Sequence, residues 1–587
     1  MGVMGAAMRT QKWRLGSAAL CGVIASLSTV ALLGTAGWLI SYAAQMPPVL
    51  ALSVAAVLVR SFALSRSVFR YLERIIGHDA AFRGLTGLRV RVYDRLERLA
   101  PVGLRRYTGG DLLARLVADV DTAVDLPLRV VLPWLQAIFV SVATVGFLAW
   151  LVPGAGLGLG VVLLIGLTLV PWLSARLALH AERRSAAARG ALSTAVVSSL
   201  DGSADLLAFG ATDLALSEVR RRDVDLTAIA RRESAGLGLG VGLSTALQGL
   251  AVVVCVIAAI PAVVDGRIEP QWLAVAALLP LAAYDVVATL PTAALARLRV
   301  RAAAERLDEV LHEPVPVRDP HRADPAPEHE VTLQCRDVHA RWSPEGAPTL
   351  RGLSFTLRPG DRVAVVGPSG AGKSTLANVL LRFVSYEGGV TLNGAPIDLM
   401  DGDDVRGVVG LMQQDAHVFD TTLRDNLRIG QIDADDDALR AVLARVGLAG
   451  WLGTLPEGLD TRVSAATMSG GERQRLALAR LLLAERRILV FDEPTEHLDP
   501  GTADALTDDL LEVTRGRSTV LITHRLRGLA QVDRILVLIN GQIRAEGTHG
   551  ELIEQGGWYA QQWVQEVERG DLAALTSRIP PGTGLVR

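Results

Sequence analysis

The first half of the chain alternates long apolar runs with two long segments rich in arginine. A helix that crosses a membrane needs about 20 mostly apolar residues, and six runs are long enough to be candidates. We expect them to be six membrane helices, at Leu15–Ile40, Pro48–Leu64, Leu128–Leu151, Gly156–Leu177, Leu237–Val264 and Trp272–Leu295. Arg60 interrupts the second run, which predicts that it faces protein or a cavity, or that the helix leaves the membrane there.

The charges between these runs predict how the chain crosses the membrane. The first–second and third–fourth loops carry no Lys or Arg, whereas 66–129 and 176–232 are packed with arginine. Segments rich in Lys and Arg stay in the cytoplasm. We therefore expect a multi-pass protein of the plasma (inner) membrane, in contact with membrane lipid, with both termini cytoplasmic. The run at Leu15–Ile40 is too long for a signal peptide, so we expect it to be a retained span.

The arginine-rich segments also have a helical pattern. Arg83–Leu99 and Arg183–Arg232 repeat apolar residues at helical spacing, with arginine on the polar face. This indicates membrane helices that continue as long helices into the cytoplasm. The alternative is a set of cytoplasmic helices without a coupling role.

The pattern changes after residue 312. Residues 313–330 are rich in proline and charge and have no apolar period, which predicts a linker. From Val331, short β-branched runs alternate with helical segments, as in an α/β domain with a largely parallel sheet. The expected fold has two parts. Residues 1–312 form an α-helical six-span membrane domain, and residues 331–570 form an α/β P-loop nucleotide-binding domain that contains the ATP site. Residues 571–587 are expected to be a flexible tail.

Composition agrees with a membrane protein and excludes some functions. Half of the 587 residues are hydrophobic, and 59 basic residues nearly balance 61 acidic ones. A protein that binds DNA or RNA usually has a basic stripe, so we expect no nucleic-acid partner. The three cysteines lie far apart, without metal-ligand spacing, and we expect them to be small buried apolar residues.

A phosphate-binding loop (P-loop) follows the strand expected at Arg362–Val366. The sequence GPSGAGKST runs from Gly367 to Thr375 and leads into a helix. Glycines let backbone N–H groups face phosphate oxygens at a helix N-terminus, the lysine neutralises the β- and γ-phosphates, and the serine hydroxyl binds Mg²⁺. We expect ATP and Mg²⁺ to be bound by Gly367, Ser369, Gly370, Gly372, Lys373, Ser374 and Thr375.

A second apolar strand, Ile488–Phe491, ends in the acid pair Asp492–Glu493. An aspartate at this place holds Mg²⁺ through water, and the adjacent glutamate is placed to orient or deprotonate the attacking water. The alternative is a pair of charges that favours a following helix N-terminus.

These motifs, with MSGGERQ at Met468–Gln474 and LITHR around His524, resemble the nucleotide-binding domain of ATP-binding-cassette (ABC) transporters over residues 331–565. The resemblance implies that Trp342 stacks on adenine, the alternative being a surface tryptophan. It implies that Gln414 contacts Mg²⁺, and the spacing to Phe419 favours Gln414 over Gln413. The resemblance also implies that His524 contacts the γ-phosphate and that Asp499 crosses a dimer interface.

The signature residues Ser469, Gly470, Gly471 and Glu472 open a helix, so their N–H groups also point at phosphate. In the family they cap the ATP held by a partner domain. One such domain per chain implies a half-transporter that must dimerise. Two departures from the family pattern concern coupling: Arg462–Thr467 lacks the glutamate that often precedes the signature, and Glu496-His497 stands where small residues are commoner before Leu498-Asp499.

Residues 1–310 resemble the membrane domain of exporters with six spans per half. Tyr107–Arg115 with Ala118–Asp121 looks like a first coupling segment, and Asp201–Gly210 like a second. A sharper resemblance, to the CydC subunits of heterodimeric CydDC transporters, rests on Arg70–Arg74, Gly77–Arg83, Val117–Thr122, Asp492–Asp499 and Thr523–Leu529. It implies a CydD-like partner and ATP-driven movement of a small molecule, either a thiol (cysteine or glutathione) or haem, in support of cytochrome bd assembly. The alternatives are a lipid or drug exporter subunit and a regulatory subunit with slow turnover.

His78 lies beside Arg70 and Arg74, where the second span meets the cytoplasm. A histidine there can ligate haem iron while arginines hold the propionates. The alternative is a histidine that forms a hydrogen bond within the inner loops.

Overall fold

The computed structural model of the chain describes residues 5, 8, 10–107, 109–342, 346–496 and 498–576. It divides into two compact units. The first contains Met1–Arg98 and Arg106–Glu313, and the second contains Leu99–Arg105 and Pro314–Arg587. The membrane unit therefore ends at Glu313, beside the linker expected at 313–330, but the short segment Leu99–Arg105 belongs to the second unit.

The first unit is α-helical. Among the described residues, six helical segments are long and apolar enough to cross a membrane, which confirms the number expected. Its helices are α2 (Lys12–Ala43), α3 (Val49–Leu99), α4 (Gly109–Ala114), η1 (Arg115–Asp119), α5 (Val120–Thr122), η2 (Leu126–Val131), α6 (Leu132–Leu151), α7 (Pro153–Asp201), α8 (Ser203–Ala208), α9 (Thr212–Val264), α10 (Gln271–Val287) and α11 (Leu290–His312).

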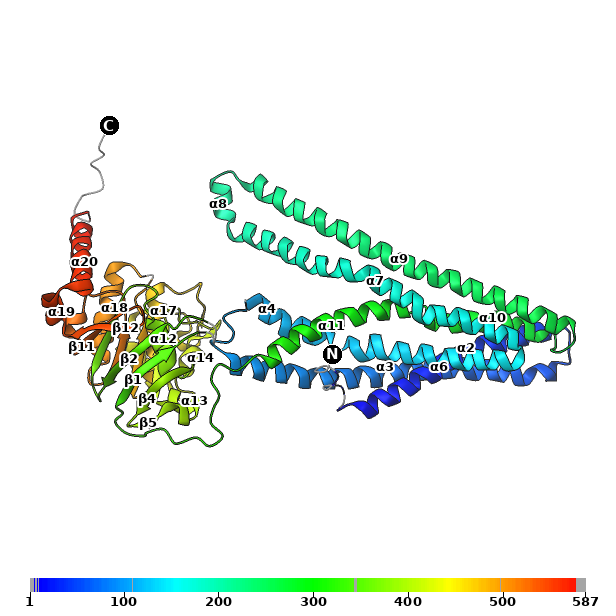
Figure 1. Ribbon diagram of the computed structural model, residues 1–587, viewed down its shortest axis with the longest axis horizontal. Coiled ribbons are helices and arrows are strands. Elements are labelled where there is room, and N and C mark those ends of the chain that lie inside the picture. Colours follow the sequence, from blue (N-terminus) through cyan, green and yellow to red (C-terminus); the bar gives the residue numbers. More distant parts are fainter. Residues whose placement is uncertain are drawn as a thin grey trace. The chain divides into compact units, whose positions relative to one another are not determined.

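Several helices continue well beyond their apolar runs. α3 runs unbroken to Leu99, so the helical pattern at Arg83–Leu99 is confirmed. The segment Arg183–Arg232 is not one helix: α7 and α9 form a hairpin that is closed by α8 (Figure 1). The chain turns at Gly210, whose φ of +65° lies in the left-handed region that favours glycine.

Small residues let the membrane helices approach closely. A Cβ atom added at Gly158 would lie 2.4 Å from Val254 Cγ1, and one at Gly166 would lie 2.4 Å from Tyr284 Oη. Interfaces between membrane helices depend on such small residues because lipid tails are as apolar as the side chains, so close packing supplies the stability. Cys255 is buried in the same core and Cys335 is buried too, as expected, whereas Cys21 is only half-buried.

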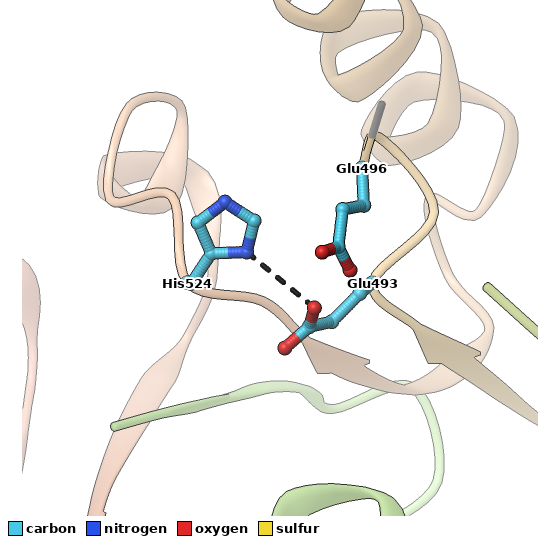
Figure 2. Close-up of side chains that lie close together, drawn as sticks. All are labelled: Glu493, Glu496 and His524. Atoms are coloured by element: carbon cyan, nitrogen blue, oxygen red, sulfur yellow. Dashed lines mark ion pairs between the residues drawn. The ribbon is translucent and has the colours of Figure 1, made fainter. Parts of the chain in front are cut away.

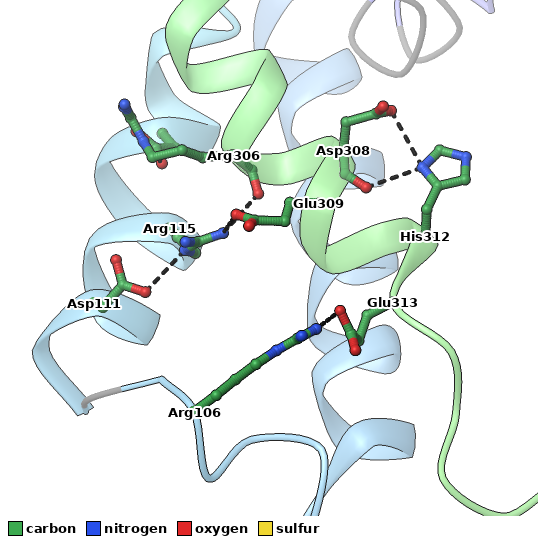
Figure 3. A network of polar contacts seen from close by, with 9 residues as sticks. Arg106, Asp111, Arg115, Arg306, Asp308, Glu309, His312 and Glu313 are labelled. Atoms are coloured by element: carbon green, nitrogen blue, oxygen red, sulfur yellow. Dashed lines mark hydrogen bonds and ion pairs between the residues drawn. The ribbon is translucent and has the colours of Figure 1, made fainter. Parts of the chain in front are cut away.

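A network of ion pairs joins the first expected coupling segment to α11 (Figure 3). Arg115 contacts Asp111 at 3.0 Å and Glu309 at 2.8 Å, and Arg306 contacts Asp119 at 2.5 Å. Arg115 and Asp119 are buried. Buried charges are costly unless they are paired, so this network fixes how the irregular turn between α4 and α6 lies on α11.

The second unit is an α/β domain with one mixed sheet at its centre. Its strand order is β12-β11-β3-β10-β9-β6, parallel except for β12. The strands are β3 (Arg362–Val366), β6 (Val409–Met412), β9 (Ile488–Asp492), β10 (Ser518–Ile522), β11 (Arg534–Ile539) and β12 (Gln542–Gly547). β9 and β10 are buried along their whole length, as is typical of parallel strands with both faces covered.

Smaller sheets and helices surround this sheet. An antiparallel sheet has the order β2-β1-β4-β5, and β7 pairs with β8. These strands are β1 (Leu333–Ala340), β2 (Leu350–Leu357), β4 (Tyr386–Leu392), β5 (Ala395–Pro396), β7 (Thr421–Thr422) and β8 (Arg462–Val463). The helices are α12 (Lys373–Leu380), η3 (Ile397–Leu399), α13 (Gly402–Val408), α14 (Leu423–Arg428), α15 (Asp436–Arg445), α16 (Ala449–Thr454), η4 (Gly458–Asp460), α17 (Gly470–Leu483), α18 (Pro500–Val513), η5 (Leu529–Gln531), α19 (His549–Gln555) and α20 (Gly557–Thr576).

The two ends of the nucleotide-binding domain differ from the simple expectation. The linker is anchored, because the buried guanidinium of Arg382 contacts Asp319 at 2.9 Å and donates to the Arg318 carbonyl at 2.8 Å. At the other end, α20 extends to Thr576, into the segment 571–587 expected to be flexible. Residues 577–587 lie outside the described part of the chain.

Candidate functional site

The P-loop connects β3 to α12 at the carboxyl edge of the parallel strands, where ligands bind in open α/β sheets. Gly372 has a φ of +103°, and a Cβ atom there would lie 2.8 Å from the Thr349 carbonyl oxygen, so only glycine fits. Lys373 is 6% exposed, and its Nζ donates to the carbonyls of Gly367 at 2.9 Å and Pro368 at 3.2 Å. Its charge is thus held inside the loop that is expected to receive phosphate.

The acid pair lies directly beside this loop. The Ser374 hydroxyl donates to Asp492 Oδ1 at 3.2 Å, so the two expected Mg²⁺ ligands are together. Oxygen ligands of this kind suit Mg²⁺, and Gln414 lines the same cavity. Burial raises the pKa of Asp492, and the neighbouring Glu493 charge raises it further, although the hydrogen bond from Ser374 opposes both.

Glu493 is held in a strained and strongly polar position (Figure 2). Its φ is +50°, which is uncommon for a residue with a side chain. Its N–H donates to the Ile522 carbonyl at 2.9 Å, so the adjacent strand β10 fixes this conformation. Its carboxylate lies 3.4 Å from Lys373 Nζ and 3.5 Å from His524 Nδ1.

The contact with His524 sets the charge of both groups. The hydrogen bond with His524 is the largest cause that lowers the pKa of Glu493, to about 2, and Lys373 also lowers it. The same bond raises the pKa of His524. Glu493 is therefore ionised at neutral pH, as a residue that orients water must be.

Trp342 and both glutamines line one cavity of about 660 Å³ with the P-loop and the acid pair. The indole Nε1 of Trp342 donates to Thr375 Oγ1 at 3.0 Å, which fixes the ring at the loop. Gln414 is half-buried and Gln413 is exposed. The Gln474 side chain donates to the Gln414 carbonyl at 2.7 Å, so the signature helix α17 supports Gln414.

The signature residues are in a separate place. Ser469 and Glu472 form a reciprocal capping box at the start of α17, with bonds of 2.7 and 3.3 Å. The described residues that line the P-loop cavity include none of Ser469, Gly470, Gly471 or Glu472. Asp499 caps α18, where its Oδ1 accepts from the Thr502 N–H at 3.0 Å. Their expected roles across a dimer interface stay predictions.

The segment before the signature forms a compact turn. The Ser464 N–H donates to Thr467 Oγ1 at 2.9 Å, and Arg462 pairs with Asp420 at 3.3 Å. The turn is therefore built without the glutamate that the sequence lacks here.

His78 is exposed on α3, and its Nδ1 lies 2.8 Å from the Arg74 carbonyl oxygen. A carbonyl only accepts hydrogen bonds, so Nδ1 carries the proton and the Nε2 lone pair is free to bind a metal. The hydrogen bond within α3 and the capacity to ligate iron are thus compatible. The nearby Asp79 contacts Arg14 at 2.7 Å and Arg83 at 3.0 Å.

Glu496 and Arg105 are among the cavity-lining residues that sequence reasoning missed. Glu496 was noted as a departure in the sequence, but its side chain approaches Glu493 and His524, with ligand atoms within 4.8 Å of one another (Figure 2). Arg105 also lines the cavity, and its guanidinium lies 4.3 Å from the Trp342 ring centroid. Nothing in the sequence relates two residues so far apart. His497 lies outside the described residues.

The chain is similar to ABC transporters in sequence and in fold. A family profile described as "ABC transporter" matches residues 350–496. The chain is 33% identical over 567 residues to the "Glutathione/L-cysteine transport system ATP-binding/permease protein CydC" of Escherichia coli (strain K12), covering 94% of this chain and 97% of that protein. It is 30% identical to the CydD protein of the same description from Bacillus subtilis (strain 168), covering 93% and 95%. The structure of a bacterial Atm1-family ABC exporter with ATP bound has the same fold, with a TM-score of 0.78, 24% identity and coverage of 94% and 98%.

Proposed function

Because this chain belongs to the CydC/CydD family of ABC transporters, we propose that it is the CydC-like half of a heterodimer that moves cysteine or glutathione across the plasma membrane. The similarity includes the membrane helices as well as the ATP site, and this observation carries the proposal. The partner is a CydD-like half-transporter, and the transport supports assembly of cytochrome bd. The nucleotide-binding domain and both termini face the cytoplasm.

The ATP chemistry rests on the residues that converge in the cavity. Lys373 and the P-loop N–H groups bind the phosphates, and Trp342 stacks on the adenine. Ser374, Gln414 and Asp492 would hold Mg²⁺, which would supply positive charge to the phosphates. Glu493 orients and deprotonates the attacking water, and His524 contacts the γ-phosphate. The close contacts among Lys373, Asp492, Glu493 and His524 favour this reading over a regulatory subunit with slow turnover.

The experiment is ATP-dependent uptake into inverted vesicles that contain both half-transporters. Radiolabelled glutathione and cysteine should accumulate with ATP, and accumulation should fall to background in Glu493→Gln vesicles. Movement of a labelled lipid in place of either thiol would instead support the lipid exporter alternative. Transport by this chain alone, as a homodimer, would contradict the pairing with a CydD-like subunit.

Haem is a second candidate cargo, and the tautomer of His78 is compatible with it. With Nδ1 bonded to the Arg74 carbonyl, Nε2 is available to ligate haem iron. Haem added to the purified heterodimer should give a Soret band that shifts in His78→Ala. His312 is a matched control, because its Nδ1 lies 2.9 Å from the Asp308 carbonyl oxygen on another exposed helix face. An unchanged spectrum and affinity in His78→Ala would exclude this role.

A further inference from the structure

The segment Leu99–Arg105 connects a membrane helix to the nucleotide cavity. It follows α3 directly, yet it packs as part of the nucleotide-binding unit. Val102 packs against the core cluster that also supports Trp342. The turn is tight: the Gly103 N–H donates to the Leu99 carbonyl at 2.8 Å, and a Cβ atom at Gly103 would lie only 2.8 Å from that oxygen.

This turn places a cation on the aromatic ring of the site. The guanidinium carbon of Arg105 lies 4.3 Å from the Trp342 ring centroid, within the range of a cation–π contact. Both residues line the P-loop cavity, and the Trp342 indole is fixed by its bond to Thr375. The Arg105 guanidinium therefore covers one face of Trp342 inside the cavity that is expected to receive the nucleotide.

A purine base cannot stack on this face while Arg105 stays in place. Stacked groups touch at about 3.5 Å, so a base between the ring and the guanidinium needs about 7 Å, far more than the 4.3 Å present. We propose that Arg105 is a base-sensing residue of the ATP site: the adenine displaces its guanidinium from Trp342 and frees the segment that continues from α3. The inference rests on the proposed stacking of adenine on Trp342.

The neighbouring arginine is held differently. Arg106 forms an ion pair with Glu313 (Figure 3) and lies 5.2 Å from the Tyr107 ring centroid. Displacement of Arg105 therefore leaves the contacts of Arg106 in place. The movement is limited to the turn at Leu99–Arg105. Arg106→Ala is the matched control, because it removes an adjacent charge that does not contact Trp342.

The test measures nucleotide affinity at this chain's own site. The full heterodimer is labelled with 8-azido-ATP at low concentration and separated into its two chains. The competitors are ATP and inorganic tripolyphosphate, which has no base. If Arg105 competes with the base, Arg105→Ala should tighten ATP binding about two- to fivefold, the strength of an exposed cation–π contact. Arg105→Ala should not change the affinity for tripolyphosphate, and Arg106→Ala should not change the affinity for ATP. Arg105→Lys should have an ATP affinity between those of wild type and Arg105→Ala.

Two further variants distinguish the displacement of Arg105 from the proposed stacking of adenine on Trp342. Trp342→Ala should weaken ATP binding but not tripolyphosphate binding, and adding Arg105→Ala to it should have no effect. If Trp342→Ala weakens both competitors equally, adenine stacking itself is wrong. If Trp342→Ala behaves as expected but Arg105→Ala weakens ATP binding or leaves it unchanged, the displacement of Arg105 is overturned.

Discussion

Glu493→Gln is the most informative single change, because it removes a charge without changing the shape of the site. The carboxylate contacts Lys373 at 3.4 Å and His524 at 3.5 Å. A positioned general base contributes about 10²- to 10⁴-fold to a rate, so the ATPase rate should fall by at least about 100-fold. ATP binding should persist, because Lys373 keeps its bonds to the carbonyls of Gly367 and Pro368.

The fold should tolerate this change. His524 is half-exposed, so its ion pair with Glu493 is worth about 1 kcal/mol or less after screening by solvent. The buried Lys373 also loses this carboxylate partner, but its Nζ keeps its bonds to the carbonyls of Gly367 and Pro368. The midpoint of thermal unfolding should therefore shift by no more than about 4 °C, and a loss of activity cannot be ascribed to unfolding.

The assay is phosphate release by the reconstituted heterodimer, with the partner's own hydrolytic site disabled so that this site alone reports. Glu554→Gln is the control, because it neutralises an exposed glutamate on α19, away from the cavity. Retention of 8-azido-ATP by the Glu493→Gln chain checks that binding survives. An ATPase rate within threefold of wild type, or loss of ATP binding, would refute the role assigned to Glu493.

Three other predictions test the structure. The hydrogen bond with Glu493 raises the pKa of His524, so the stabilising effect of the His524 charge is complete below the unfolded pKa of about 6.5 and is lost as pH rises through the higher folded pKa. The unfolding midpoint of the nucleotide-free wild type should therefore lose its advantage over His524→Gln as pH rises above about 6.5. Arg382→Ala should lower the unfolding free energy by about 1–3 kcal/mol, because the carbonyls of Arg318 and of the buried Met400 lose a donor. Arg341→Ala, at an exposed ion pair, should cost less than about 1 kcal/mol in the same denaturant titration. In detergent, Gly158→Ala should lower the unfolding temperature clearly more than Gly160→Ala, because the added Cβ atoms would lie 2.4 Å and 3.6 Å from their nearest neighbours.

The sequence predicts the parts of this protein that depend on local patterns. Six apolar runs were enough to predict the membrane spans, and the P-loop and the acid pair could each be placed at the end of a strand. Parallel strands end at one edge of a sheet, so Lys373, Asp492 and His524 could be expected to meet there. The ion pairs of Glu493 with Lys373 and His524, and the bond from Ser374 to Asp492, lie at this edge of the sheet.

Features that depend on tertiary contacts could not be predicted from the sequence. The helical pattern at Arg183–Arg232 does not show where α7 ends, because arginine-rich polar faces continue on both sides of the turn at Gly202–Ala211. The proline-rich linker looks unstructured, yet Asp319 is fixed by the buried Arg382. Arg105 resembles every other arginine of its segment, and only the fold brings it to Trp342.

The position of the signature residues is consistent with a half-transporter that works as a dimer. Glu472 closes the start of α17 through the capping box, so its carboxylate is already engaged within its own helix. The N–H groups at the start of that helix do not line the cavity formed by the described P-loop residues, so they are available for a phosphate held elsewhere. We therefore expect a complete ATP site to combine Lys373 and Glu493 from one chain with a signature from another. Because a heterodimer builds two such sites from different sequences, Glu496 can differ from the small residue usual in the family at one site without requiring the same change at the other.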